Sequence, residues 1–546
     1  MAKRIIIIFI VFVLLIIGGW QARRFFPYPA FFARLGIENW QVWEFHDYFE
    51  IDPSTLSVVL NDRRLVGLEN PPVMTDGQIY FPYTFVREHI DPFVFWDNKA
   101  QILFVSTDTE IIRLPGQMIP ISFVRDMYTF PYFEIKYEPM YNTVIIHNRA
   151  NSGAPAATTR HTSIRYRPDH TAFITKRAEN GTSLTAFNAA GEFTRIRTPE
   201  GLLGYVLSSD IVITGSGSEG IYLEPPTHPA PRINLAWEMI TAPIGNATVM
   251  NNPLPRGLNV ISPTWFNFDP YLLDGTIISF ADRDYVEWAH AEGVKVWPKV
   301  FDTNQNISHA ILTSYQARSR AINQLIQFVE HYNLDGININ FEHIRSTDGY
   351  YYLQFLRELA VEMRRIDSVL SVATFVPAPW RERYKHNLVG KTVDFVAIMT
   401  YDEHYGGSPN PGPVASLPFV RQYIRETLEL IPREKVLMGL PFYNRLWRVT
   451  PDGNHTIRNI GMAYAWRLVE EWGITPIWDE VIGSYYTNFI TQTDEGIITY
   501  RMWIECERSI REKLRIFTYY DLAGVASWQR SLETPGVWEE IERVMP

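Results

Sequence analysis

Eight apolar runs from residue 233 onward constrain the fold of this chain more than any other feature. Each run is typical of a strand, and helical spacing of apolar residues separates the runs, most clearly over 315–331 and 351–365. The runs are Ile233–Ile240, Leu258–Thr264, Val294–Phe301, Gly336–Glu342, Leu370–Val376, Val393–Thr400, Val436–Phe442 and Gly524–Trp528. Eight strands alternating with helices predict an α/β fold over 233–546, a (β/α)8 or TIM barrel. The stretch 444–513 is too long for one helix and predicts an insert between strands seven and eight.

The fourth run, Gly336–Glu342, contains the first candidate for a functional site. Side chains alternate along a strand, so Asn338, Asn340 and Glu342 share one face of it. Polar groups on so apolar a strand are costly unless they are satisfied. In a barrel of this type, catalytic groups lie at the carboxyl ends of the strands, which makes Glu342 a candidate acid. A satisfied internal polar network without chemistry would give the same pattern.

Three motifs resemble one enzyme family. Asp335–Glu342 is similar to the D-G-x-D-x-D-x-E signature on the fourth strand of family 18 glycoside hydrolases, the chitinase family. Met399–Asp402 resembles the family's M-x-Y-D on the sixth strand, and Trp528 stands where the family has its eighth-strand tryptophan. Residues 399–418 and 503–509 resemble the branch that degrades spore cortex and cell-wall peptidoglycan.

The resemblance implies substrate-assisted, retaining hydrolysis of N-acetylhexosamine glycans with no metal or organic cofactor. Glu342 would protonate the glycosidic oxygen while the substrate's own acetamido oxygen attacks the anomeric carbon. Tyr401 would hydrogen-bond the acetamido carbonyl, and Asp402 would hold the sugar. Trp528 would stack under the sugar ring.

Four further residues are candidates for substrate binding. Asn338 and Met399 belong to the motifs themselves. His404 lies in the Gly/Pro-rich loop after strand six, where a sugar contact and a plain surface histidine are both open. Glu505 either reaches the cleft from the insert or is a solvated charge.

The sequence departs from the family pattern at Asn338 and Asn340, where the signature has aspartates. An asparagine at 340 can still accept a hydrogen bond from the acetamido N–H, but it supplies no negative charge and shares no proton with Glu342. Three hypotheses follow. The chain is a glycosidase acting on peptidoglycan, spore cortex or chitin, a catalytically weakened glycan-binding protein at the cell wall, or a wall-anchoring scaffold with a vestigial barrel.

The N-terminal segment 1–24 predicts a signal-anchor. A basic head precedes the apolar run Ile5–Trp20, and a cleaved signal peptide remains the alternative. The rest of the chain would then lie outside the cytoplasm, tethered to the membrane or secreted. Cys506 is the single cysteine, so an intramolecular disulfide is excluded. The formal net charge of −10 argues against nucleic acid as a partner.

Two small modules and a linker are expected between the anchor and the barrel. Residues 38–150 contain an internal repeat of helix, strand, turn and strand, and resemble the α+β module at the N-terminus of bacterial copper amine oxidases. Residues 157–214 resemble the bacterial SH3-like domain, a small β-barrel that implies cell-wall binding, with a ligand-free spacer as the alternative. The Gly/Ser- and Pro-rich stretch 215–232 predicts a linker.

Overall fold

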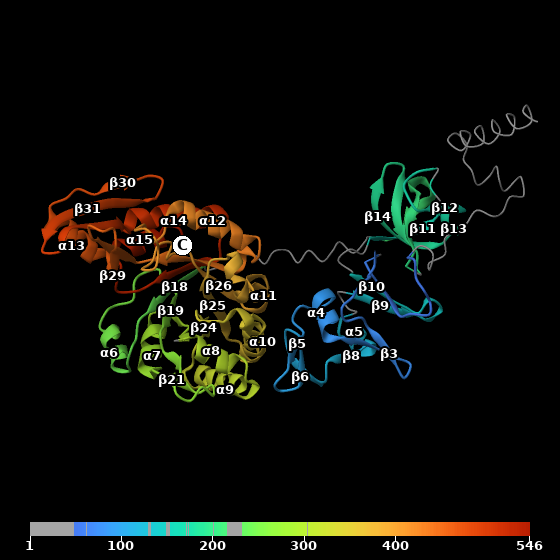
Figure 1. The fold of residues 1–546 in the computed structure, drawn as a ribbon, viewed down its shortest axis with the longest axis horizontal. Helices are drawn as coiled ribbons and strands as arrows, with labels where there is room; N and C mark the ends of the chain where they lie inside the picture. The colour runs from blue at the N-terminus through green and yellow to red at the C-terminus, as the bar shows by residue number, and fades with distance from the viewer. Residues whose placement is uncertain are drawn as a thin grey trace, which may run out of the picture. The chain divides into compact units, whose positions relative to one another are not determined.

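The computed structural model describes residues 49–545, except 62, 129–132, 149–152, 171, 173, 200, 216–231 and 303. The predicted anchor 1–24 and nearly all of the linker 215–232 therefore lie outside the described residues. Among the residues that are described, no helix combines the length and apolarity needed to cross a membrane. The chain groups into two compact units (Figure 1). The first holds the described residues before Asp91 and those between Met118 and Leu223, and the second holds Asp91–Gln117 and the described residues after Glu224.

The second unit contains a closed ring of parallel strands. Its members are β18 (Ile233–Glu238), β19 (Val260–Pro263), β22 (Lys295–Val296) with its continuation β23 (Lys299–Phe301), β24 (Gly336–Asn340), β25 (Val369–Phe375), β26 (Phe395–Met399), β27 (Val436–Pro441) and β33 (Gly524–Trp528). Each pairs in parallel with the next, and β33 pairs with β18 to close the ring. The predicted eight-stranded barrel is therefore confirmed, strand for strand.

Helices surround this ring in Figure 1. They are α6 (Ile244–Met250), α7 (Arg283–Ala291), α8 (Gln305–Leu312), α9 (Tyr315–Tyr332), α10 (Gly349–Arg365), α11 (His386–Thr392), α12 (Leu417–Leu428), α14 (Glu507–Tyr520) and α15 (Gly536–Glu542). A short hairpin, β20 (Phe266–Phe268) and β21 (Ile277–Ser279), follows β19 in the chain and extends the sheet. Capping side chains and backbone conformation determine where these helices begin and end, as α9 illustrates. Ser314 caps α9 by accepting a hydrogen bond from the Ala317 N–H, and Asn333 ends that helix in the left-handed conformation.

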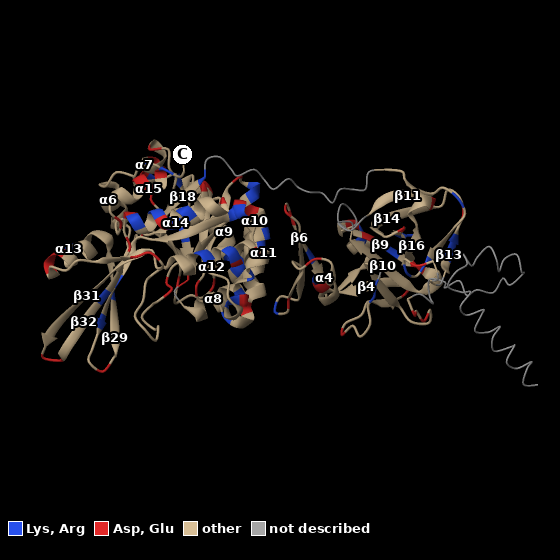
Figure 2. Ribbon diagram, turned by 90° about the horizontal axis from the view of Figure 1, so that it is seen from above, with Lys and Arg blue, Asp and Glu red and all other residues tan. Residues whose placement is uncertain are grey.

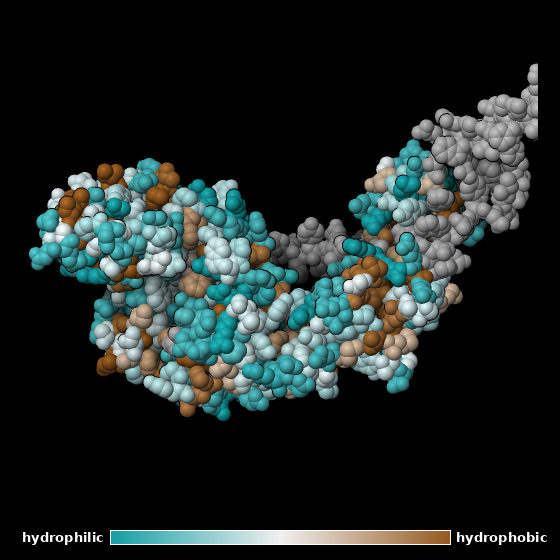
Figure 3. Space-filling view, in the orientation of Figure 1, coloured by the Kyte–Doolittle hydropathy of each residue, from teal (hydrophilic) through white to brown (hydrophobic). Residues whose placement is uncertain are grey.

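An inserted subdomain lies between β27 and β33, as expected from its length. It comprises β28 (Tyr443–Val449), β29 (His455–Gly461), α13 (Met462–Trp472), β30 (Ile477–Asp479), β31 (Ser484–Thr493) and β32 (Gly496–Ile504), and its five strands form an antiparallel sheet. Acidic residues such as Asp452 and Glu495 lie at the hairpin tips (Figure 2). Figure 3 shows brown, apolar atoms over this part of the surface, where Ile477 is 72% and Ile490 61% exposed.

Residues 91–117 belong to the barrel's unit although they precede it by more than a hundred residues. They form β5 (Phe95–Asp97), β6 (Ile102–Ser106) and β7 (Ile111–Pro115), an antiparallel sheet. Arg318 of α9, fully buried, donates to Asp97 at 3.2 Å and to Glu358 of α10 at 2.8 Å.

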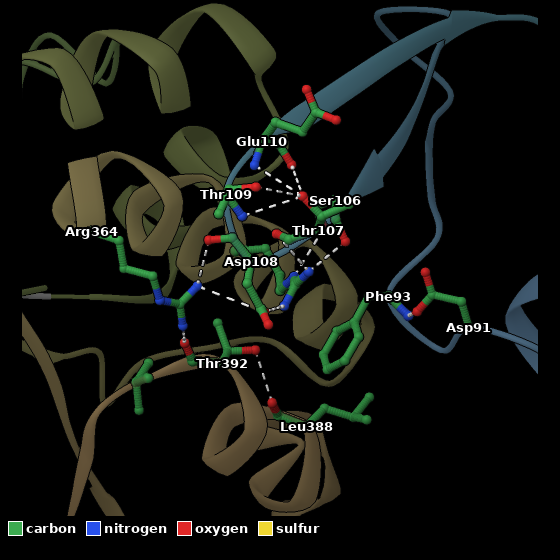
Figure 4. Close-up of polar contacts among 12 residues, drawn as sticks. Asp91, Phe93, Ser106, Thr107, Asp108, Thr109, Glu110, Arg364, Leu388 and Thr392 are labelled. Atoms are coloured by element: carbon green, nitrogen blue, oxygen red, sulfur yellow. Dashed lines mark hydrogen bonds and ion pairs between the residues drawn. The ribbon is translucent and has the colours of Figure 1, made fainter. Parts of the chain in front are cut away.

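Two arginines of α10 extend this attachment. Arg357 Nε donates to Ser106 Oγ at 2.9 Å. Arg364 links the Asp108 carbonyl, at 3.2 Å, to the Thr392 carbonyl of α11, at 2.7 Å (Figure 4). Hydrogen bonds donated by the buried Arg318 and Arg357 and by the exposed Arg364 therefore fasten this strand segment to the outside of the barrel.

The first unit holds the remaining small elements. They are β1 (Ser57–Leu60), β2 (Arg63–Arg64), β3 (Val73–Thr75), β4 (Gln78–Pro82), α4 (Tyr83–His89), β8 (Met118–Pro120), α5 (Ile121–Tyr128), β9 (Phe133–Glu138) and β10 (Thr143–Asn148), then β11 (Ala154–Thr158), β12 (Thr162–Arg165), β13 (Ile174–Ala178), β14 (Ser183–Ala190), β15 (Phe193–Arg197), β16 (Leu203–Leu207) and β17 (Ile211–Ile213). The last seven form one antiparallel sheet.

Both copies of the predicted repeat are visible, each with a short helix followed by a hairpin. The hairpin of the first copy, β5–β6, is part of the barrel's unit, whereas that of the second, β9–β10, stays in the first unit. The predicted range 38–150 is thus divided between the two units. The likenesses to the amine-oxidase module and the SH3-like domain stay predictions.

Candidate active site at the carboxyl ends of the barrel strands

The polar face of β24 points into the barrel. Asn338 is fully buried: its Oδ1 accepts from Trp237 Nε1 at 3.0 Å, and its Nδ2 donates to Ser371 Oγ at 2.9 Å. Asn340 is 2% exposed and donates from Nδ2 to the Ala373 carbonyl at 3.3 Å. Among the described residues, Asn340 Oδ1 accepts no hydrogen bond. The amide of Asn338 is therefore satisfied within the barrel, while Asn340 keeps an acceptor for a ligand.

Glu342 lies two residues beyond the end of β24 and is partly buried. Its backbone is fixed from two sides. Its N–H donates to Asp302 Oδ1 at 2.9 Å, and its carbonyl accepts from the Tyr384 hydroxyl at 2.7 Å. Asp302 also accepts from the His343 N–H at 2.9 Å and from the Ser308 hydroxyl. These bonds hold the carboxyl-bearing residue in place without occupying its side chain.

Tyr401 and Asp402 extend the site from the end of β26. Tyr401 is 6% exposed, and its ring lies against Tyr443 with 6.3 Å between centroids. A Cβ on Gly439 would lie 3.0 Å from the Tyr401 ring, so the glycine permits this placement. Burial is the main cause that raises the pKa of Tyr401 well above its usual value, and the neighbouring Tyr443, Asp402 and Glu342 act in the same direction, so the phenol stays protonated. Its hydroxyl has no hydrogen-bond partner in the described part of the chain.

Asp402 is held by the insert. Its Oδ1 accepts from the Tyr443 hydroxyl and from Arg445 Nη2, both on β28. The Asp402 side chain is nevertheless 44% exposed, so its other oxygen remains available to a ligand. Arg445 also donates to the His404 carbonyl. The insert therefore positions the loop that follows β26.

Trp528, at the end of β33, is partly buried and packs against Trp237, with 5.9 Å between ring centroids. Lys299 of β23 places its ammonium 4.4 Å from the Trp528 ring centroid. This lysine is 8% exposed. Burial lowers the pKa of Lys299 to about 8, and the charges of Glu342 and Asp302 act in the opposite direction.

The structure gives the surroundings of three further predicted contacts, and those of one contradict its prediction. Glu505 is fully buried, where its carboxylate accepts from Lys513 Nζ at 2.9 and 3.0 Å and from Ser509 Oγ at 2.7 Å. Glu505 directly follows β32, where it is a buried charge paired within the protein, and the prediction that it binds substrate is wrong. Met399 is 8% exposed and packs in the barrel wall. His404 is partly buried, with Nδ1 3.1 Å from the Pro413 carbonyl.

Five residues around the site were not predicted from the sequence: Asp302, Lys299, Tyr384, Tyr443 and Arg445. Two of these carried a signal. Asp302 is the first residue after the third predicted strand, and Lys299 is a charge within that apolar run. The other three depend on how loops and insert fold back over the barrel. Within the described residues there is no group of three or more His, Cys, Asp or Glu side chains suited to hold a metal.

A closed parallel barrel with a carboxyl group after its fourth strand, and a tyrosine and a tryptophan beside it, is an arrangement that suits a glycoside hydrolase. Residues 279–533, just under half of the chain, match the family model described as "Glycosyl hydrolases family 18". The chain therefore contains a domain of glycosyl hydrolase family 18, and the resemblance drawn from the motifs is confirmed.

Similar proteins and solved structures are consistent with this domain assignment. An uncharacterized glycosylase of Bacillus subtilis, YvbX, is 26% identical over 299 residues, which cover 52% of this chain and 84% of the relative. The cortical fragment-lytic enzyme of the same organism is 26% identical over 242 residues, 43% of this chain and 55% of the relative, so this chain spans about half of that enzyme. The crystal structure of the Bacillus cereus spore cortex-lytic enzyme SleL has the same fold, with a TM-score of 0.50, 20% identity, and coverage of 58% of this chain and 74% of SleL.

Proposed function

We propose that this chain hydrolyses an N-acetylhexosamine-containing glycan of the cell wall, using the substrate's own acetamido group as the nucleophile. One arrangement carries the proposal. The carboxyl of Glu342 lies on a fixed backbone, and the neighbouring Tyr401 hydroxyl and Asn340 Oδ1 both lack a protein partner among the described residues. An acid beside one free donor and one free acceptor suits an acetamido group, whose carbonyl needs a donor and whose N–H needs an acceptor.

In the proposed reaction Glu342 gives its proton to the glycosidic oxygen as the bond to the anomeric carbon breaks. The acetamido oxygen attacks that carbon from the opposite side, while Tyr401 donates to this oxygen and Asn340 accepts from the acetamido N–H. Glu342, now ionised, takes a proton from water, and the water opens the resulting oxazolinium ring with net retention. Trp528 provides an apolar face for the sugar, and Asp402 accepts from its hydroxyl groups. No metal or organic cofactor is required.

Peptidoglycan or spore cortex is the substrate we favour. The names of the relatives, a cortical fragment-lytic enzyme and a spore cortex-lytic enzyme, support this choice. A membrane-tethered, extracytoplasmic location through segment 1–24, and wall binding through residues 157–214, belong to the same proposal and rest on the sequence. Chitin remains the alternative polymer.

The test is Glu342→Gln in the full chain. Removing a general acid costs about 10²- to 10⁴-fold in rate, and because Glu342 would serve in both steps we expect turnover of peptidoglycan, cortex and chitin to disappear. Thermal stability and glycan binding should remain. Glu382→Gln, which removes an exposed carboxyl from the loop after β25, is the matched control and should retain turnover. Undiminished turnover in Glu342→Gln would refute the proposal, and a large loss of stability would indicate a structural role.

Asn340 favours one second candidate, a protein that binds such glycans without cutting them. An amide at 340 gives no negative charge to a developing cation. If the wild-type chain binds these polymers but releases no product from any of them, as mass analysis of the digests would show, the binding function replaces the hydrolytic one.

A further inference from the structure

The barrel mouth has an unusual charge pattern for the site just proposed. The signature on the fourth strand would place three carboxyl groups on its polar face, whereas this chain has two amides and Glu342. The neighbouring strand adds a cation. In the parallel register of β23 and β24, Lys299 lies beside Asn338, so its side chain points to the same, inner side of the barrel.

The Lys299 ammonium has no hydrogen-bond or ion-pair partner among the described residues. It contacts two aromatic faces, with Nζ 4.4 Å from the Trp528 ring centroid and 5.6 Å from that of Phe301. Neither of the two nearby acids, Asp302 and Glu342, bonds to the ammonium. Asp302 is already occupied by the Ser308 hydroxyl and two backbone N–H groups, and no carboxylate oxygen of Glu342 forms an ion pair with it.

An ammonium that is only 8% exposed has lost most of its hydration, and cation–π contacts do not replace the lost hydrogen bonds, so this placement is costly. The pKa of about 8 means that most molecules still carry this charge at neutral pH. A ligand that brings an anionic oxygen beside Trp528 would satisfy those donors. A neutral ligand of the same shape would leave them unpaired, so the site would discriminate between the two.

We propose that Lys299 binds a carboxylate carried by the sugar that lies against Trp528, so that the preferred glycan of this site is acidic. The inference rests on the proposed glycan-binding function of the same site. Two sources share this chemistry and keep the acetamido group: the carboxylate on the lactyl ether of a muramic acid residue without its peptide, and the C6 carboxylate of an N-acetylhexosaminuronic acid.

The experiment measures binding without turnover, in full-length Glu342→Gln protein. The probes are peptide-free peptidoglycan strands, oligosaccharides that contain an N-acetylhexosaminuronic acid, the same two glycans with their carboxylates reduced to alcohols, and chitin oligosaccharides of equal length. We expect at least one carboxylate-bearing glycan to bind about 10-fold or more tightly than its reduced form, and the preferred probe identifies the source.

Adding Lys299→Met should reduce this ratio to about one, whereas adding Lys299→Arg should keep much of it. Lys295→Met, which removes an exposed charge from β22, is the control and should leave the ratio unchanged. Equal binding of carboxylate and alcohol forms, or a preference that survives Lys299→Met, would overturn the inference. If wild-type protein cleaves neutral chitin oligosaccharides without such a preference, only this inference falls. If the preference is present but no glycan is cleaved, the inference stands and the hydrolase proposal falls.

Discussion

Replacing Lys299 with methionine should stabilise the protein at neutral pH. Burial lowers the pKa of this lysine from its usual 10.5 to about 8, so the folded state holds the proton less tightly than the unfolded chain does. Keeping the side chain charged in the barrel then costs about 3 kcal/mol of folding free energy. Methionine fills a similar volume without a charge and avoids this cost.

The effect has a defined pH dependence. Between pH 8 and 10.5 the unfolded state binds more protons, so wild-type stability rises with pH over this window. The advantage of Lys299→Met is therefore full below pH 8, falls through the window and vanishes above pH 10.5. Thermal unfolding of both proteins across this range should show a difference in Tm of about 5 °C at neutral pH.

Lys295→Met again serves as the control, because it removes an exposed charge rather than a buried one, and we expect no pH-dependent difference. A Lys299→Met protein that is less stable than wild type at neutral pH, or a gain that persists above pH 10.5, would refute the reasoning. Together with lost selectivity for carboxylates, the predicted gain would show that stability is given up here for binding.

Three other predictions follow from contacts and sequence described above. Asn340→Asp should raise the cleavage rate by about 10²-fold, because a carboxylate stabilises the developing cation. The same change should lower the Tm, because it loses the donor to the Ala373 carbonyl. An unchanged or lower rate in product assays would mean that the site is arranged for an amide. Lys513→Met should lower the free energy of unfolding by about 3–5 kcal/mol and leave KM unchanged, since it leaves the buried Glu505 without its cationic partner. A raised KM at full stability would instead indicate that Glu505 contacts the substrate. The apolar run Ile5–Trp20 should place the full chain in the membrane fraction with the barrel open to added protease, and recovery of a soluble form beginning near residue 23 would show a cleaved signal instead.

The barrel and the face of its fourth strand could be predicted because they depend on short-range periodicity. A buried parallel strand is a run of apolar residues, and helical spacing separates one run from the next, so all eight strands could be placed. Alternation along β24 places Asn338 and Asn340 inside the barrel by geometry alone. A family resemblance then supplied Tyr401 and Trp528.

The remaining site depends on contacts between distant segments. Arg445 and Tyr443 reach Asp402 only because the insert folds back over the barrel, and nothing in the local sequence indicates that pairing. The error at Glu505 was avoidable. Ser509 and Lys513 follow it at intervals of four, a spacing that brings side chains together along a helix and predicts an internal pair.

The attachment of residues 91–117 to the barrel has a consequence for synthesis of the chain. Asp97 and Ser106 bond to helices that lie 221 and 251 residues further along. At about 5–20 residues per second, the ribosome needs tens of seconds to supply those partners. During this interval Phe95, Leu103 and Phe104, all buried in the finished protein, have no surface to pack against. Until α10 has emerged, the nascent chain therefore exposes apolar side chains that favour aggregation.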